Sequence, residues 1–386
     1  MKVKWTTFLY DVLLSALGSY GGPEAHYGMF SSLLVKKRKY LKEEELTEMI
    51  GLYALVPGPS STQTITAIGY YIGGPVLALL TFLVWALPAI IVMSLIGVFF
   101  NVIGNTYYEP MLTYLPAVAV GFIIYAFIIL SVKVIKDKRD FLLYSVMFLA
   151  AFLYVGFSMW VIPLLLMLGG FITLLPYIKE LSTIKVKAKP RWWILLVIIM
   201  LALLSEVLLR FFDHSFFILF NSFYRYGYSV IGGGNIVIPL MIQDLVETKG
   251  LLSLNDFLSG YAIDQAIPGP LFSFAGFVGA RSVLQMAFLS GIISGLSIFL
   301  PGILLVFFIF PLWQQTRHNQ KIKHFLKGVS ITAASLILMT AIKQSFLLEV
   351  DIKVYLVVVI TTLLLITKRL PAPLIILLAL LLGFIL

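Results

Sequence analysis

Tyr20-Gly21-Gly22-Pro23, followed by Pro57-Gly58-Pro59, is the stretch that decides the fold, because the pattern returns in the second half of the chain. There, Ile231-Gly232-Gly233-Gly234 is followed by Pro268-Gly269-Pro270. The distances from Gly22 to Pro57 and from Gly233 to Pro268 are both 35 residues, and the offset between the copies is 211. We infer a tandem duplication in which a helix-breaking motif occurs at matching points of both halves.

The composition indicates a chain that lies in a lipid bilayer. Hydrophobic residues make up 60% of the 386 residues, charged residues make up 12%, and the mean hydropathy is +1.01. Soluble domains carry about 25% charged residues. The stretches long enough for the roughly 20 residues of a spanning helix are 73–100, 110–132, 192–212, 283–312 and 327–348. Shorter apolar stretches that can also span are 141–157, 159–177, 354–367 and 371–386.

The net charge of +10 fits a membrane protein better than a nucleic-acid-binding protein. The basic residues occur in short blocks between apolar stretches, at 36–39, 133–139, 179–191, 317–327 and 368–369. With a cytoplasmic N-terminus, 22 of the 28 Lys and Arg lie inside, which is the positive-inside bias. We therefore predict a multi-pass plasma-membrane protein with no nucleic-acid partner. No cleavable signal peptide is expected, because Asp11 interrupts the first segment and no small-residue cleavage site follows.

The order of membrane crossings that places most basic residues inside requires four segments to enter and leave the membrane on the same side. These helical hairpins or re-entrant pairs are 5–35, 46–71, 214–245 and 257–281. Because 192–212 is one extra crossing, the second half is inverted relative to the first. The prediction is an all-α polytopic membrane protein with an inverted tandem repeat, whose helices are broken or re-entrant at the Gly-Gly-Pro and Pro-Gly-Pro motifs. Its parts are the first repeat (1–178), a basic cytoplasmic linker with a connecting transmembrane helix (179–213) and the second repeat (214–386).

Broken helices at corresponding points of two halves are typical of a transporter site. A helix N-terminus attracts an anion through its unpaired N–H groups and its positive dipole end. Pro59 favours a helix start, and the residues after it add side-chain donors in the first turn. The alternative is that Gly and Pro only kink packed helices. The substrate-binding candidates are Gly21, Gly22, Pro23, Pro57, Gly58, Pro59, Ser60, Ser61, Gln63, Arg225, Gly232, Gly233, Gly234, Asn235, Gln265, Pro268, Gly269 and Pro270.

Ionisable residues inside apolar segments are costly and usually functional. Glu24 and His26 follow the first Gly-Gly-Pro motif, and Asp264 precedes the second Pro-Gly-Pro motif, so these three are the proton-coupling candidates. The alternative for Glu24 and His26 is interfacial solvation. Arg225 is the candidate for a substrate-facing cation, with snorkelling to the outer interface as its alternative. Asp264 is expected to neutralise Arg225 or Arg281 when no anion is bound.

Three segments resemble the signatures of the chromate ion transporter (CHR) family. Gly21-Gly22-Pro23-Glu24-Ala25-His26 resembles the FGGPxAH signature, with Tyr20 where the family often has Phe. Leu55 to Gln63 resembles the second signature, and Gln265 to Pro270 resembles its second-domain copy. Ala54 and Ser60 stand where the family often has Gln and Asn. The resemblance covers nearly the whole chain and implies a secondary transporter of oxyanions, with chromate export as the namesake activity and sulfate as a similar ion.

Other functions have less support in the sequence. A phosphate-binding loop ending in Gly-Lys-Ser/Thr is absent, which argues against an ATP-driven pump. Four scattered His, no Cys and no Asp-rich motif give neither a metal site nor a catalytic cluster, so we expect no enzyme, no cofactor and no metal. An anion channel remains an alternative, and an integral-membrane enzyme is a weaker one. The remaining partners are the bilayer and a small inorganic oxyanion, and the chain can act as a monomer or a homodimer.

Overall fold

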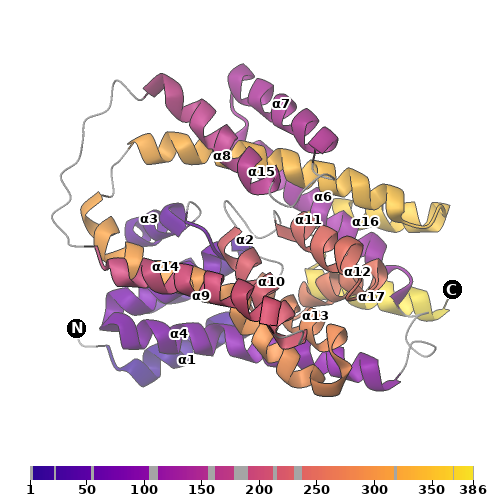
Figure 1. The fold of residues 1–386 in the computed structure, drawn as a ribbon, viewed down its shortest axis with the longest axis horizontal. Coiled ribbons are helices and arrows are strands. Elements are labelled where there is room, and N and C mark those ends of the chain that lie inside the picture. Colours follow the sequence, from indigo (N-terminus) through magenta and orange to yellow (C-terminus); the bar gives the residue numbers. More distant parts are fainter. Residues whose placement is uncertain are drawn as a thin grey trace. The chain divides into compact units, whose positions relative to one another are not determined.

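The computed structural model describes residues 3–20, 23–53, 56–103, 112–154, 161–177, 190–211, 215–229, 237–316, 320–367 and 369–385. Every regular element in these ranges is helical, as the sequence predicted (Figure 1). The chain divides into two compact units. Unit 1 contains Met1–Asn105, Val186–Val230 and Ile263–Arg317, and unit 2 contains Thr106–Lys185, Ile231–Ala262 and His318–Leu386. Each unit therefore combines segments from both halves of the sequence.

Unit 1 is built around two long helices that come from opposite halves of the chain, α4 (Ser60–Ile103) and α14 (Ala287–Thr316). They pack against each other and against α13, and α14 also packs against α10 (Figure 1). The other elements of unit 1 are α1 (Trp5–Leu17), α2 (Pro23–Met29), the π-helix η1 (Phe30–Lys37), α3 (Glu43–Tyr53), α9 (Trp192–Phe211), α10 (Ser215–Ser229), η5 (Leu271–Ser273), α13 (Phe274–Ser282) and η6 (Leu284–Met286).

The first half of α4 folds back on its second half. Gly73 and Gly74 have non-helical backbone angles, with φ 77° at Gly74. The Thr81 hydroxyl occupies the place where a Cβ of Gly69 would stand. In a straight helix these two positions would be about 18 Å apart, so the chain reverses between them. The second repeat does the same, since Ser294 of α14 fills the corresponding space at Gly279 of α13.

Asp11 is fully buried in α1, and the structure gives it structural partners. Its Oδ1 accepts hydrogen bonds from Arg38 Nε at 3.0 Å and Nη2 at 2.7 Å, and its Oδ2 accepts one from the Tyr40 hydroxyl at 2.6 Å. Removing one partner of a buried charge pair is costly because it leaves the other unpaired. Asp11 therefore fixes the turn after η1 to α1.

Unit 2 is centred on α15 (Gln320–Leu347), which packs on three helices of the first repeat. These are α6 (Leu115–Val134), α7 (Lys138–Tyr154) and α8 (Val161–Leu174). The other elements of unit 2 are η2 (Leu175–Tyr177), α11 (Val237–Met241), the π-helix η4 (Ile242–Thr248), most of α12 (Leu254–Asp264), α16 (Ile352–Thr367) and α17 (Ala372–Ile385).

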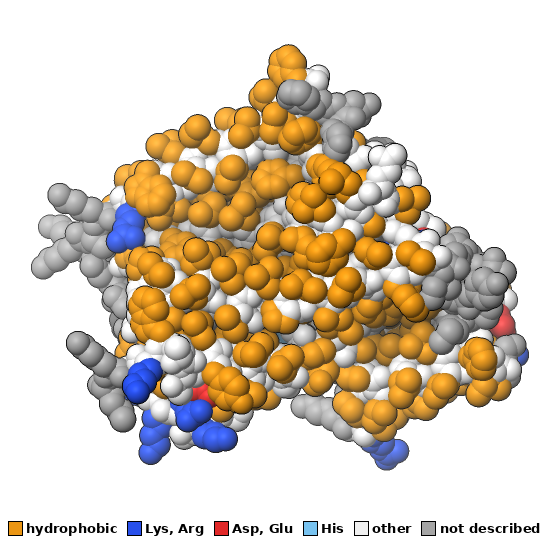
Figure 2. Space-filling view, turned by 90° about the horizontal axis from the view of Figure 1, so that it is seen from below, with side chains coloured by type: hydrophobic (Ala, Val, Ile, Leu, Met, Phe, Trp, Pro, Cys, Tyr) orange, Lys and Arg blue, Asp and Glu red, His pale blue; other side chains and the backbone are white. Residues whose placement is uncertain are grey.

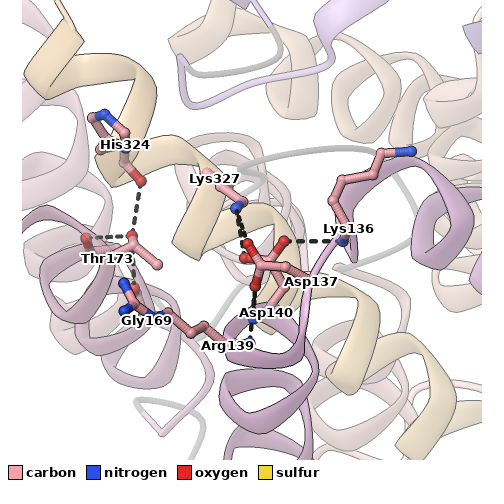
Figure 3. A network of polar contacts seen from close by, with 9 residues as sticks. Lys136, Asp137, Arg139, Asp140, Gly169, Thr173, His324 and Lys327 are labelled. Carbon is pink, nitrogen blue, oxygen red and sulfur yellow. Dashed lines mark hydrogen bonds and ion pairs between the residues drawn. The ribbon is translucent and has the colours of Figure 1, made fainter.

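A polar network joins α7, α8 and α15 in unit 2 (Figure 3). Lys327 Nζ lies 2.6 Å from Asp140 Oδ1, and the Thr173 hydroxyl donates to the His324 carbonyl at 2.7 Å. Asp137 accepts the N–H groups of Asp140 and Arg139 at the start of α7. The Asp140 N–H and the nearby cationic groups lower the pKa of Asp137 below its usual value. Lys327 of one basic block thus pairs with carboxylates at another basic block.

Five helices in the described ranges are long and apolar enough to cross a membrane. They are Ser60–Val102, Leu115–Val132, Trp192–Phe211, Leu284–Trp313 and Lys327–Leu347. The first of these is the folded-back α4, so its 43 residues are not one straight span. Figure 2 shows a face covered by apolar side chains, with the visible charged ones at its margins. These features indicate a multi-pass membrane protein.

Candidate functional site

The two Pro-Gly-Pro loops have the same unusual backbone conformation, and both lie in unit 1. Gly58 has φ 128° and Gly269 has φ 138°, which are values that residues with a side chain rarely adopt. Each loop leads directly into helical structure: α4 begins at Ser60, and η5 begins at Leu271. The repeated sequence therefore builds a repeated turn and a repeated helix start.

Each loop packs on a proline-containing helix of the other repeat. A Cβ on Gly58 would lie 2.8 Å from the Gly302 Cα atom, next to Pro301 of α14. A Cβ on Gly269 would lie 2.5 Å from the Ala89 Cβ atom, next to Pro88 of α4. Real Cβ atoms need more space than this, so both contacts require glycine in the loop.

Gln63 ties the first loop to α14. Its buried side-chain Nε2 donates to the Pro57 carbonyl at 2.8 Å and to the Gly302 carbonyl at 3.1 Å. Its Oε1 is buried and has no hydrogen-bond partner in the described part of the chain. Gln63 therefore fixes the first loop to α14, and its buried Oε1 can accept a hydrogen bond.

Ser60 and Ser61 open the first turn of α4, and both are buried. The Tyr27 hydroxyl lies 3.0 Å from Ser60 Oγ, and His26 Nδ1 lies 2.9 Å from Ser61 Oγ. The His26 ring is fully buried, meets Trp85 edge to face at 5.1 Å between centroids, and lies against the backbone of Gly269. His26 therefore connects the start of α4 with the second Pro-Gly-Pro loop.

This arrangement has the chemistry of an anion site. A serine hydroxyl has one hydrogen and two lone pairs, so Ser60 keeps its hydrogen for a ligand while accepting from Tyr27. The first N–H groups of α4 have no partner within the helix and carry its positive dipole end. The second copy has Leu271 and Phe272 in place of the two serines. The two loops therefore share a backbone but differ in side-chain donors.

Asp264 lies beside the second loop and is buried. The Ser273 hydroxyl lies 2.8 Å from Asp264 Oδ1, and no ion pair of Asp264 occurs among the described residues. Arg281 instead donates to the Asn101 side chain, because it ends α13 next to α4. The expected neutralisation of an arginine by Asp264 is thus not the arrangement in this structure. Gln265 is also buried, and its Nε2 has no partner in the described ranges.

Arg225 is half-buried on α10, with its guanidinium 5.9 Å from the centroid of the Tyr226 ring. Gly227 of the same helix packs against the Ile298 carbonyl and Pro301 of α14. Arg225 and Gly227 are two residues apart, which corresponds to about 200° around a helix. The Arg225 side chain therefore starts on a different face of α10 from the one that meets α14.

Several predicted site residues lie outside the described residues: Gly21, Gly22, Gly232, Gly233, Gly234 and Asn235. Pro23 begins α2, as expected for a helix start, and Glu24 follows it in that helix. Sequence reasoning missed Tyr27 and Gly302, although Gly302 follows Pro301, the counterpart of Pro88 in the repeat. No group of three His, Cys, Asp or Glu side chains that would suit a metal occurs in the described ranges.

The fold and the paired helix breaks define the class: a duplicated, multi-pass helical membrane protein with a polar site at the breaks. A family model described as chromate transporter matches residues 6–174 and again 217–384. The chain therefore belongs to the chromate transporter family.

Individual relatives cover almost the whole chain. A probable chromate transport protein of Synechococcus elongatus is 26% identical over 97% of this chain and 94% of its own. A chromate transport protein of Cupriavidus metallidurans is 25% identical over 98% and 92%. An uncharacterized transporter of Methanocaldococcus jannaschii is 25% identical over 95% and 90%. No solved structure matches the chain.

Proposed function

We propose that this protein is a secondary active transporter of oxyanions, chromate and/or sulfate, in the plasma membrane, and that its activity is ion-gradient-coupled chromate efflux. The observation that carries the proposal is the buried pair Ser60 and Ser61 at the start of α4, oriented by Tyr27 and His26. Two relatives named as chromate transport proteins support the substrate class.

A tetrahedral dianion is held well by many neutral donors arranged around it. Hydrogen bonds to a charged group contribute about 1.5–3 kcal/mol each. Full cations would bind a dianion more tightly, but a transporter must also release it. Two hydroxyls and the N–H groups of one helix start supply neutral donors, so that Arg225, the proposed substrate-facing cation, does not have to balance the dianion alone.

The test of this function is flux in proteoliposomes that contain the purified protein. We expect labelled chromate or sulfate to enter with saturation, and a pH gradient to change the initial rate. Flux that rises linearly with concentration and ignores the gradient would favour an anion channel instead. No flux of either anion above empty liposomes would reject the proposed function.

The coupling ion proposed here is the proton, and its candidate carriers are Glu24, His26 and Asp264. His26 and Asp264 are both buried in unit 1; His26 lies against the backbone of Gly269 in the second Pro-Gly-Pro loop, and Asp264 is hydrogen-bonded to Ser273 just after this loop. Buried titratable groups gain or lose a proton more readily than they stay charged without a partner. Of these candidates, His26 contacts a proposed anion donor directly, since its Nδ1 lies 2.9 Å from Ser61 Oγ.

Arg225→Gln is expected to abolish net oxyanion uptake, because Arg225 is the proposed substrate-facing cation. The reason is the loss of one charge-assisted contact and of the compensating charge in an apolar segment. Initial rates should be compared at equal protein content, with Arg210→Gln on the neighbouring α9 as control. Normal uptake by Arg225→Gln would show that Arg225 is not required and that the donors at the helix N-termini are sufficient to hold the anion.

Inverted topology predicts that Lys37 and Asn255, which flank the connection between the two motifs in the first and the second repeat, are on opposite sides of the membrane. The chain has no cysteine, so Lys37→Cys and Asn255→Cys each provide a single thiol. We expect an impermeant maleimide to label position 255 from outside and position 37 only after permeabilisation. Outside labelling at position 37 would contradict the inversion.

A further inference from the structure

Three groups beside the second Pro-Gly-Pro loop make a small closed cluster: Asp264, Ser273 and the Pro270 carbonyl. Asp264 and Ser273 are 4% and 2% exposed. The Ser273 Oγ atom lies 2.8 Å from Asp264 Oδ1 and 2.6 Å from the Pro270 carbonyl oxygen. Both distances are those of hydrogen bonds between oxygen atoms.

The hydrogen count of this cluster shows which form of Asp264 it suits. Ser273 has one hydroxyl hydrogen, and an ionised Asp264 and the Pro270 carbonyl are both acceptors only. One of the two short contacts would then have no hydrogen. If Asp264 is protonated, its hydrogen goes to Ser273 Oγ, and the Ser273 hydrogen goes to Pro270. Both contacts are then complete.

The cost of burying a charge also favours the protonated form of Asp264. An ionised carboxylate in a buried place is costly unless it is paired and well hydrogen-bonded. In the described part of unit 1, the groups that hydrogen-bond to Asp264 are the Ser273 hydroxyl and the Phe274 N–H, which are both neutral. Its Oδ2 has no hydrogen-bond partner among the described residues.

The cluster is connected to the anion donors through the second loop. Pro270 follows Gly269, whose backbone lies against the His26 ring, and His26 is hydrogen-bonded to Ser61. His26 is thus a titratable side chain that also contacts this loop. A change in how Ser273 holds Pro270 would move the loop that supports His26 and, through it, Ser61.

We propose that Asp264 binds the coupling proton, and that its neutral form holds the second Pro-Gly-Pro loop in the conformation seen here through Ser273 and Pro270. When the proton leaves to water, the Ser273 hydrogen turns to the carboxylate and Pro270 loses its donor. The loop is then free to move relative to His26 and Ser61. The inference rests on the proposed oxyanion transport and assigns its coupling site.

The central variant is Asp264→Asn, because the amide still donates to Ser273 but carries no exchangeable charge. We expect this variant to fold and to exchange anion for anion, while a pH gradient no longer drives its net uptake. In the wild type, the initial rate should change by about tenfold per pH unit on the limb beyond the apparent pKa of a one-proton step, and in Asp264→Asn it should be flat. Asp264→Ala, which has no donor for Ser273, should lose both exchange and net uptake.

The matched control is Asp244→Asn in unit 2. Asp244 is also buried, but it pairs with Lys249 at 2.9 Å. This variant should keep the pH dependence of the wild type. If Asp264→Asn kept the wild-type pH dependence while the wild type transported oxyanion, the inference would be wrong and the transport function would stand.

A second readout works without any transport activity. Infrared difference spectra between low and high pH should contain the band of a protonated carboxyl group that is missing in Asp264→Asn. If the wild type moved no oxyanion, the proposed function would fail, and this band would still decide whether Asp264 holds a proton. An identical band in wild type and Asp264→Asn would overturn the assignment.

Discussion

Gly58→Ala is expected to reduce oxyanion transport by about tenfold to hundredfold, since backbone strain of about 1–3 kcal/mol corresponds to factors of this size. The new methyl group would force a side chain onto a residue with φ 128° and place a Cβ 2.8 Å from the Gly302 Cα atom. The neighbour is backbone and cannot rotate away. Initial rates in proteoliposomes and the melting temperature in detergent measure the effect.

The matched control for Gly58→Ala is Gly51→Ala in α3, where a Cβ meets nothing within 4 Å. Alanine also favours a helix interior, so this control should transport normally. The second loop gives a further check, because Gly269→Ala clashes with a side-chain atom of Ala89. Adding Ala89→Gly should recover part of the activity, with the strain at φ 138° remaining. Wild-type rates in Gly58→Ala would show that the loop geometry is not required.

The double variant Ser60→Ala/Ser61→Ala is expected to raise the half-saturating oxyanion concentration by about hundredfold or more. Each hydroxyl lost from a charged ligand costs about 1.5–3 kcal/mol, and every 1.4 kcal/mol is about tenfold in affinity. Both hydroxyls are buried at the start of α4, so water cannot easily replace them. Concentration series of initial rates, with folding checked by melting temperature, provide the measurement.

Two controls separate ligand contact from packing in this experiment. Ser335→Ala in α15 removes a buried hydroxyl whose hydrogen-bond partner among the described residues is the Thr332 carbonyl of its own helix, and it should not alter the half-saturating concentration. Tyr27→Phe removes the donor that orients Ser60 and should have a smaller effect, because a neutral hydrogen bond is worth about 0.5–1.5 kcal/mol. Adding Tyr27→Phe to Ser60→Ala should change little further, since contacting residues do not act independently. Wild-type kinetics in the double serine variant would show that the anion binds elsewhere.

The sequence alone was sufficient for the helical membrane class, the duplication and the places where helices begin. Pro23 begins α2 and Ser60 begins α4, as the proline positions predicted. These features are local: proline lacks a backbone N–H and fixes φ, glycine permits positive φ, and long apolar runs favour helices in lipid. The duplication could be detected because the spacing between the two motifs is a property of the sequence itself. The inversion of the second repeat stays a prediction from the distribution of basic residues.

Which residues contact the broken helix ends could be determined only from the tertiary structure. Gly58 meets Gly302, Gly269 meets Ala89, and His26 lies between Ser61 and the backbone of Gly269. Likewise, the sequence singled out Asp264 as a proton-coupling candidate and suggested an arginine partner, whereas the structure gives it Ser273. Most of these contacts join residues from opposite halves of the chain. Hydropathy and turn propensity act over a few neighbouring residues, whereas which surfaces meet depends on how whole helices pack.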